Sequence, residues 1–321
     1  MKNYTLDKLI ESVKTRIPIS NTESSGTDDS SITLHLNESM VEIILPFLIK
    51  VREEYLVKTE LIPIVANTSR YVIPTRAVAN KLRDVMFRDR SSNPNRISLA
   101  RIDRGKISEM DGLGAAANAT AFYMEGDHLV LIPTMNASPN GSLEISYFFR
   151  PGELVGSDYY RLITAVDLVN GTVTVATTPS GWDTTKKYDI HGPNSGAEIR
   201  RWDLNATNVG ANIFTFDQSM DKSEYKDPVQ VGDYLVLADT SALPSIPNEL
   251  QPVLIQAAVC KIAEARGDEM WQTHNQRLKD MMEGQLFLID DRVEGKSQKI
   301  CGGTLLRAGR YGGIRTSRNI S

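Results

Sequence analysis

The side chains that most often carry out chemistry are present in this chain, but their spacing does not form a reactive site. Four histidines are scattered along the sequence, at His35, His128, His191 and His274. They lack the paired spacing of His, Cys and carboxylate ligands that a metal site requires. The acidic pairs Asp28-Asp29 and Asp290-Asp291 fall in a predicted loop and at a predicted helix end, positions typical of solvated surface. We therefore expect neither a metal ion nor a carboxylate catalyst.

Two glycine-containing motifs have structural explanations beside the functional ones. The run GLGAAANA at 112–119 lacks the Gly-Lys-Ser/Thr ending and the strand-to-helix setting of a phosphate-binding loop, so it predicts an irregular loop. The tripeptide Arg266-Gly267-Asp268 places glycine where a helix C-cap belongs and aspartate where the next helix begins. The sequence also has no Gly-x-Ser-x-Gly elbow and no nucleophile with a neighbouring base. We therefore expect no enzymatic activity and no cofactor.

Positive charge is concentrated in one stretch of a mildly acidic chain, whose formal net charge is −4. From Arg70 to Lys106, ten basic residues stand against three acidic ones, a local charge of +7. Such a surface could neutralise DNA phosphates without reading bases. We favour instead a solvated strand face, or arginines paired across a subunit boundary, because nucleic-acid modules interleave exposed aromatic residues and few occur here. The candidate residues are Arg83, Arg88, Arg90, Arg96, Arg101 and Arg104.

The C-terminal segment 293–321 is basic and too poor in apolar residues to fold by itself. From Lys296 onward it contains six Lys and Arg residues and no acid. Apolar anchors spaced among arginines are typical of a segment that orders on binding a partner, where each arginine can pair with a carboxylate. The alternative is a tail that stays disordered. The expected contact residues are Leu305, Leu306, Arg307, Arg310, Tyr311, Ile314, Arg315 and Arg318.

Both ends of the chain before this arm have helical periodicity. Apolar residues recur at helical spacing from Leu6 to Val13, after Thr5 as N-cap. The composition of 20–31 predicts a mobile loop. A second helix is predicted to start near Asn37, with a kink at Pro46.

A third predicted helix follows Asn248 and is apolar nearly all round, which indicates a helix buried on all sides. Its alanines, Ala258 among them, allow neighbouring backbones to approach closely. Gly267 is expected to end this helix, and Asp268 to open the last one.

The middle of the chain has the two-residue periodicity of strands. Alternating apolar runs recur between Leu61 and Asp239, with turn signals between them. Asn170-Gly171 lies between two such runs and is the strongest hairpin signal in the chain. Many short strands at this spacing predict an antiparallel sandwich or small barrel.

These elements predict an α+β protein with a discontinuous helical core from both chain ends, a large antiparallel β insertion and an extended C-terminal arm. The expected parts are helical residues 1–60, the β-rich insertion 61–244, helical residues 245–292 and the arm 293–321. Apolar residues make up 41% of the chain, an ordinary globular share. Two cysteines, Cys260 and Cys301, cannot build a disulfide framework, and no signal or membrane-spanning run is evident. We expect a soluble protein made in a reducing compartment, with no membrane partner.

Several segments resemble the head-to-tail adaptor (connector) proteins of tailed bacteriophages. The most specific are Ala-Asn-Lys-Leu-Arg-Asp at 79–84 and Ile-Pro-Asn-Glu-Leu at 246–250. The resemblance covers nearly the whole chain, and its motifs are structural, while 156–231 departs most from it. The matching segments are FLIKVREEYLVKTELIPI (47–64), RYVIPTRAVANKLRDVMF (70–87), FYMEGDHLVLIP (122–133), SYFFRPGELV (146–155), PSIPNELQPVLIQAAVCKIAEARGD (244–268) and the arm after DDRVEGKSQKI (290–300).

The resemblance implies a structural virion protein at the neck, made in the host cytoplasm. It implies a homo-oligomeric ring of twelve subunits beneath the portal protein, which completes the DNA-filled head and extends the DNA channel. It also implies an arm that reaches the portal, a β-rich part facing tail or nozzle proteins, and non-specific contact with packaged double-stranded DNA. Such a ring needs a heterologous, closing interface between copies.

Two other functions remain open at this point. A tail-tube or baseplate component would share the β content but would not need a basic arm. A carbohydrate-binding or carbohydrate-active protein could use Trp182, Trp202 and Tyr188 as a stacking platform, although core packing explains these aromatics better.

Overall fold

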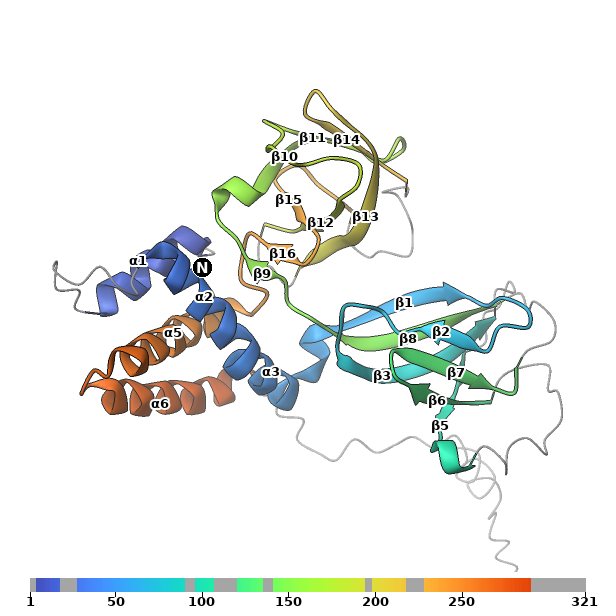
Figure 1. The fold of residues 1–321 in the computed structure, drawn as a ribbon, viewed down its shortest axis with the longest axis horizontal. Coiled ribbons are helices and arrows are strands. Elements are labelled where there is room, and N and C mark those ends of the chain that lie inside the picture. Colours follow the sequence, from blue (N-terminus) through green and yellow to red (C-terminus); the bar gives the residue numbers. More distant parts are fainter. Residues whose placement is uncertain are drawn as a thin grey trace, which may run out of the picture.

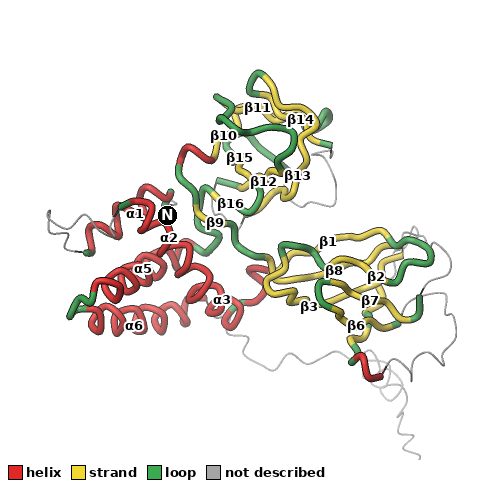
Figure 2. The backbone as a smooth tube through the Cα atoms, in the orientation of Figure 1, coloured by secondary structure: helices red, strands yellow, loops and turns green. Residues whose placement is uncertain are grey.

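The protein is an α+β chain whose helices and sheets lie in separate regions, as the sequence predicts (Figures 1 and 2). The computed structural model describes residues 4–17, 28–89, 96–106, 120–134, 141–193, 198–217 and 228–289. The predicted arm 293–321 therefore lies outside the described residues. Antiparallel pairing dominates the sheets, and one of them closes into a six-stranded barrel.

The first two helices begin at capping residues. Helix α1 (Leu6–Arg16) starts after Thr5 and buries the predicted apolar face. Helix α2 (Asp29–Ser39) starts well before the predicted Asn37, so the prediction that the loop 20–31 reaches Ser31 is wrong. Asp28 occupies the N-cap position, and its carboxylate accepts hydrogen bonds from the hydroxyls of Ser30 and Ser31. Asp and Ser side chains form hydrogen bonds with nearby backbone groups both in loops and at N-caps. Composition alone therefore does not locate the start of α2.

Pro46 widens the helix without ending it. After α2, the segment Met40–Ile44 forms a π-helical turn, and α3 (Leu45–Val51) follows directly. The Leu45 N–H donates to the Met40 carbonyl, five residues back. Because proline has no N–H to donate and its ring crowds the preceding turn, a widened turn accommodates it. The predicted interruption is therefore a π-helical turn inside one long helical run.

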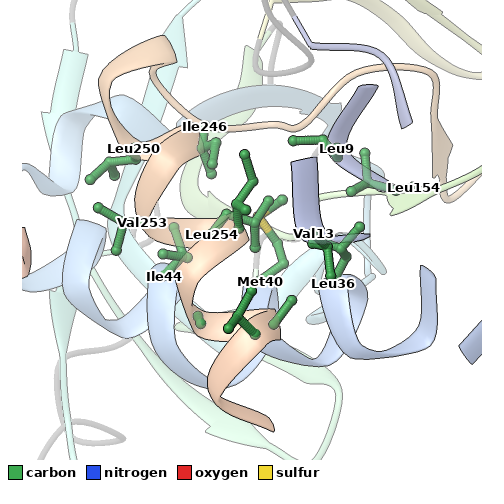
Figure 3. Close-up of a cluster of buried hydrophobic side chains, with 14 of the residues drawn as sticks. Leu9, Val13, Leu36, Met40, Ile44, Leu154, Ile246, Leu250, Val253 and Leu254 are labelled. Carbon is green, nitrogen blue, oxygen red and sulfur yellow. The ribbon is translucent and has the colours of Figure 1, made fainter. Parts of the chain in front are cut away.

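Helices from the two ends of the chain share one hydrophobic cluster. Helix α5 (Gln251–Arg266) is buried along most of its length, as predicted, and ends at Gly267, whose φ is +66°. Helix α6 (Trp271–Ile289) follows after Asp268, whose carboxylate accepts the Met270 N–H. Figure 3 shows α5 side chains meeting those of the N-terminal helices. The labelled members of the cluster are Leu9, Val13, Leu36, Met40, Ile44, Leu154, Ile246, Leu250, Val253 and Leu254.

Among the described residues, one helical run, Asp29–Val51, is long and apolar enough to cross a membrane, with a mean hydropathy of 1.4. Core helices satisfy the same criterion. In this run the most deeply buried apolar side chains recur every fourth residue and belong to the cluster shared with α5. They are Ile32, Leu36, Met40, Ile44 and Leu48. The run therefore has the one-sided burial of a helix packed on a core.

The chain between the helices contains a β-sandwich and a β-barrel, each with its own core. The sandwich packs two four-stranded sheets around one apolar cluster. One sheet has the order β1 (Val57–Pro63), β8 (Gly141–Phe149), β3 (Ala77–Asp89), β4 (Arg96–Ser98). The other has the order β2 (Arg70–Val72), β7 (His128–Ile132), β6 (Ala121–Glu125), β5 (Ala100–Arg101).

The barrel surrounds a second apolar cluster. The predicted Asn170-Gly171 hairpin is confirmed, since it joins the first two barrel strands and Gly171 adopts a φ of +65°. The predicted region 61–244 thus divides into two β units, one of each architecture that the sequence left open. The barrel order is β10 (Tyr160–Asp167), β11 (Thr172–Val175), β14 (Ile213–Phe216), β13 (Ile199–Gly210), β12 (Lys187–His191), β15 (Tyr234–Leu237).

The burial of α5 gives a first prediction. Ala258 is fully buried, whereas Ala265 on the same helix is exposed. We expect Ala258→Leu to lower the free energy of unfolding by about 1–3 kcal/mol, because the added bulk has no space among the packed helices. Ala265→Leu is the matched control and should change it by less than about 0.5 kcal/mol. Urea denaturation measures both, and equal stability of the two variants would contradict the buried position of α5.

Candidate functional site

The predicted basic residues that the structure describes lie on or beside the sandwich, where carboxylates of the same chain neutralise several of them. Arg83, on β3, has its guanidinium within 4 Å of three carboxylates, and the nearest is Glu53 at 3.4 Å. Arg96, on β4, pairs with Glu144 of β8 at 3.0 Å between Nε and Oε2. The Glu144 side chain is only 12% exposed, so its charge needs a partner. These pairs form within one chain, an outcome that the sequence-based alternatives did not include.

The outer face of the second sheet repeats this arrangement. Glu125 lies between Arg70 and Arg104, at 3.2 Å and 3.1 Å from their guanidinium nitrogens. Beside them is an open groove of about 470 Å³, which is lined in part by Arg101 and Tyr123. Arg88 lies opposite Arg96 in the β3–β4 pair. Within the described part of the chain, Arg88 and Arg101 form no ion pair. Arg90 and the arm residues from Leu305 to Arg318 lie outside the described residues.

Among the described arginines of the basic stretch, the most heavily buried is Arg76, which the sequence did not single out. It lies between β2 and β3, and only 2% of it is exposed. Its guanidinium bonds to Asp189 of β12 and pairs with Asp239 at 2.8 Å and with Asp203 of β13 at 3.6 Å. It also lies over the Phe149 ring, 5.5 Å from the centroid. Arg76 therefore connects the sandwich to three acidic residues of the barrel region.

The three carboxylates surround Arg76 from different elements. Asp189 is nearly inaccessible, and it also accepts the backbone N–H groups of Asp203, at 2.9 Å, and Asp239, at 3.3 Å. Burial raises the pKa of Asp189 to about 6, although Arg76 acts in the opposite direction. Burial alone would lower the pKa of Arg76, but the three carboxylates raise it above its ordinary value. The cluster keeps a buried cation paired and ties three acidic residues to one position on the sandwich.

Groups next to this cluster are also perturbed. Burial and the charge of Asp203 raise the pKa of Glu60 on β1. Burial, Glu60 and Asp203 raise the pKa of Tyr147 on β8, which is fully buried. Phe149 packs edge-on against Trp202 of β13, with 6.0 Å between the ring centroids. The contact between sandwich and barrel thus combines a buried charge cluster with an aromatic pair.

A second junction joins the β units to the helices. The strand β9 (Glu153–Leu154) leads from the sandwich to the barrel, and Leu154 exchanges two hydrogen bonds with the Asn37 side chain of α2, at 2.8 Å and 3.2 Å. It pairs in parallel with β16 (Thr240–Ser241), which leads from the barrel to α5. A Cβ at Gly152 would lie 2.9 Å from the Thr240 backbone, so glycine permits this approach. The connection from the sandwich to the barrel and the connection from the barrel to α5 therefore run side by side, next to α2.

The aromatic residues considered for carbohydrate stacking do not form an exposed platform. Trp182 and Tyr188 belong to the barrel core, where they pack against each other at 5.4 Å between ring centroids. Trp202 packs against the sandwich core. The expected explanation, core packing, is therefore confirmed for these side chains. Among the described residues, no group of three or more His, Cys, Asp or Glu residues could hold a metal ion.

No protein-family model matches the chain, and no curated protein has a significantly similar sequence.

The Arg76 cluster gives the second prediction. We expect Arg76→Met to lower the free energy of unfolding by about 3–5 kcal/mol at pH 8, because it leaves the buried Asp189 without its cation. In the wild type, Asp189 has a raised pKa of about 6, so its contribution to stability falls as the pH rises from about 4 to 6. Arg76→Met should raise the pKa of Asp189 further, so that the fall in stability extends to higher pH. The loss of unfolding free energy caused by Arg76→Met should therefore be smaller at pH 5 than at pH 8.

Urea denaturation at both pH values measures this difference. Arg150→Met is the matched control, since Arg150 is an exposed arginine of the same unit whose guanidinium makes one long bond, 3.4 Å, to a carbonyl. Arg150→Met should lower the free energy of unfolding by less than about 0.5 kcal/mol at either pH. A deficit for Arg76→Met that is small, or equal at pH 5 and pH 8, would show that the charge cluster does not hold the two β units together.

Proposed function

We propose that this protein is a structural component of a tailed-bacteriophage neck. Twelve copies would form a ring beneath the portal protein, complete the DNA-filled head, extend the DNA channel and hold tail or nozzle proteins below. The sequence resemblance to head-to-tail adaptors motivates this proposal. The protein would act by assembly, without enzymatic chemistry or a cofactor.

One structural observation supports the proposal most directly. The helices, the sandwich and the barrel each have a separate apolar cluster, and they extend in different directions from the junction at β9 (Figure 1). A ring subunit must contact the portal, its neighbours and the tail at the same time, and three units joined at fixed points provide separate surfaces for these partners. In this proposal the helices from both ends act as one core and the segment 293–321 acts as the portal-binding arm.

The intrachain ion pairs bear on the proposed contact with DNA. Arg76, Arg83, Arg96 and Arg104 already pair with carboxylates of their own chain, so the local excess of +7 does not produce an equally charged surface. Contact with DNA would then depend on the remaining cations, such as Arg88 and Arg101, and would be weak. Weak, diffuse contact suits a channel through which DNA must slide.

A tail-tube or baseplate component is the second candidate, because it too would use a barrel and a sandwich as assembly units. The two candidates differ in the C-terminal segment, since only the adaptor needs a basic arm that reaches a portal. The carbohydrate-related alternative loses its proposed platform, because Trp182 and Tyr188 are buried.

The arm gives the third prediction. Deleting Gly302–Ser321 should leave the thermal midpoint within about 2 °C of the wild type, because the deleted sequence has too few apolar residues to add to the core. Binding to the portal protein should be lost. Differential scanning calorimetry and co-purification with portal measure the two effects. Retained portal binding, or a midpoint several degrees lower, would contradict the assignment of the arm.

Arg88 and Arg101, which form no ion pair with any residue that the structure describes, give the fourth prediction. The isolated protein should bind duplex DNA weakly and without sequence preference, and binding should fall steeply with salt because each contact releases phosphate counterions. We expect Arg88→Glu with Arg101→Glu to weaken this binding, whereas Arg150→Glu, outside the basic stretch, should change it less. Filter binding at several salt concentrations measures this.

Light scattering with portal protein present would show whether rings still form in these variants. Intact rings with weaker DNA binding would place Arg88 and Arg101 at the channel. Failed ring assembly would place them at the subunit boundary. Tight, sequence-selective and salt-insensitive binding by the wild type would contradict the adaptor proposal.

A further inference from the structure

The long N-terminal helical run has an unpartnered apolar face. Leu34 and Val41 are 57% and 55% exposed, although α2 and the π-helical turn bury the opposite face in the core. The two side chains are seven residues apart, close to two helical turns, so they lie on one face. A groove of about 270 Å³ runs beside them and is closed on its other side by Pro151 and Gly152. Apolar side chains exposed along a groove indicate a surface that another segment covers.

The rim of this groove is acidic. Glu38, Glu42 and Glu153 all line it. Lys261 of α5 pairs with Glu38 at 3.2 Å and with Glu42 at 2.6 Å, so one lysine serves two carboxylates. Glu153 is exposed beside them. The groove therefore carries a net negative charge and fits a segment that combines apolar anchors with several cations.

We propose that residues 302–318 of the same chain occupy this groove in the free subunit. That segment contains three aliphatic anchors, Leu305, Leu306 and Ile314, and it has arginines but no acidic residue. The anchors would cover Leu34 and Val41, and the arginines would pair with the rim carboxylates. This inference goes beyond the proposed function, because it concerns a contact that forms before any portal is present.

The chain is long enough for this contact. Helix α6 ends at Ile289, so Leu305 follows sixteen residues later and can lie up to roughly 50 Å from the helix end. Helices α2 and α6 both pack on α5, a helix of about 24 Å, so the groove lies within that reach. A single arm could therefore cover the groove of its own subunit.

This contact would order the steps of assembly. While the arm covers Leu34 and Val41, the apolar face is hidden from neighbouring subunits. A portal that binds the arm removes it from the groove and exposes the face to the next copy. Rings would then form on the portal in preference to free solution.

The experiment uses the full chain without portal. A photo-crosslinking amino acid replaces Val41, and isotopically labelled and unlabelled chains are mixed before irradiation. We expect crosslinks from position 41 to residues 302–318 of the same chain, with fewer at high salt because the rim contacts are electrostatic. The same crosslinker at Val169, an 82% exposed barrel residue, is the control and should not capture the arm.

Limited trypsin digestion provides a second measurement. Cleavage after Arg307 and Arg310 should be about tenfold faster in Leu34→Ser with Val41→Ser than in the wild type, because the arm loses its apolar contacts without any change in rim charge and is released more often. Val169→Ser with Val231→Ser, at two exposed positions outside the groove, should leave the rate unchanged.

Three outcomes would overturn the inference. Crosslinks to a different copy would show that a second subunit covers the groove. Absence of crosslinks, or equal cleavage rates in wild type and groove variant, would show that the arm does not bind there. None of these outcomes depends on portal binding. If the arm binds the portal but not the groove, this inference fails and the proposed function stands. If the arm binds the groove but not the portal, the proposed function fails and this inference stands.

Discussion

The buried guanidinium of Arg76 is the constraint on which the arrangement of the β units depends. A cation this inaccessible is costly unless carboxylates surround it, and here they come from β12, from β13 and from the chain after β15. These carboxylates lie on or just after three strands that are direct neighbours in the barrel sheet, β13, β12 and β15. The sandwich therefore finds its full set of charge partners only where these three strands have paired, which makes the two units interdependent although their apolar clusters are separate.

The helical part imposes a similar dependence between distant segments. The N-terminal helices bury their apolar faces against α5, which the chain supplies only after both β units. Leu154 belongs to the same cluster while it bonds to Asn37, so the crossing between sandwich and barrel is part of the helical core. Such contacts are far apart in sequence, and their loop-closure entropy predicts slow folding relative to a helical bundle of similar size.

The sequence predicts those features that depend on local patterns. Helix α1, the buried helix α5, its Gly267 cap and the Asn170-Gly171 hairpin each depend on periodicity or turn chemistry within a short window. The start of α2 at Asp29 was missed because Asp and Ser favour loops and N-caps alike. The Arg76 cluster could not be found, because its carboxylates lie more than a hundred residues away and no spacing rule connects them. The local count of charged residues predicts the basic stretch, but it does not show the carboxylates from other parts of the chain that neutralise it.

These constraints have a consequence for the proposed ring. Arginines that are already neutralised within a chain contribute less to an interface, so the basic stretch has few free cations to offer a neighbouring subunit. Apolar surface on the helical run is the stronger remaining candidate, because Leu34 and Val41 are exposed while the other Leu, Ile, Met, Phe and Val residues of that run are buried or half-buried. If this apolar surface forms the interface between subunits without ion pairs to restrict it, free subunits could associate at any time. A basic arm that covers this surface until a portal removes it would supply the missing control, and it would account for an acidic rim beside an apolar face.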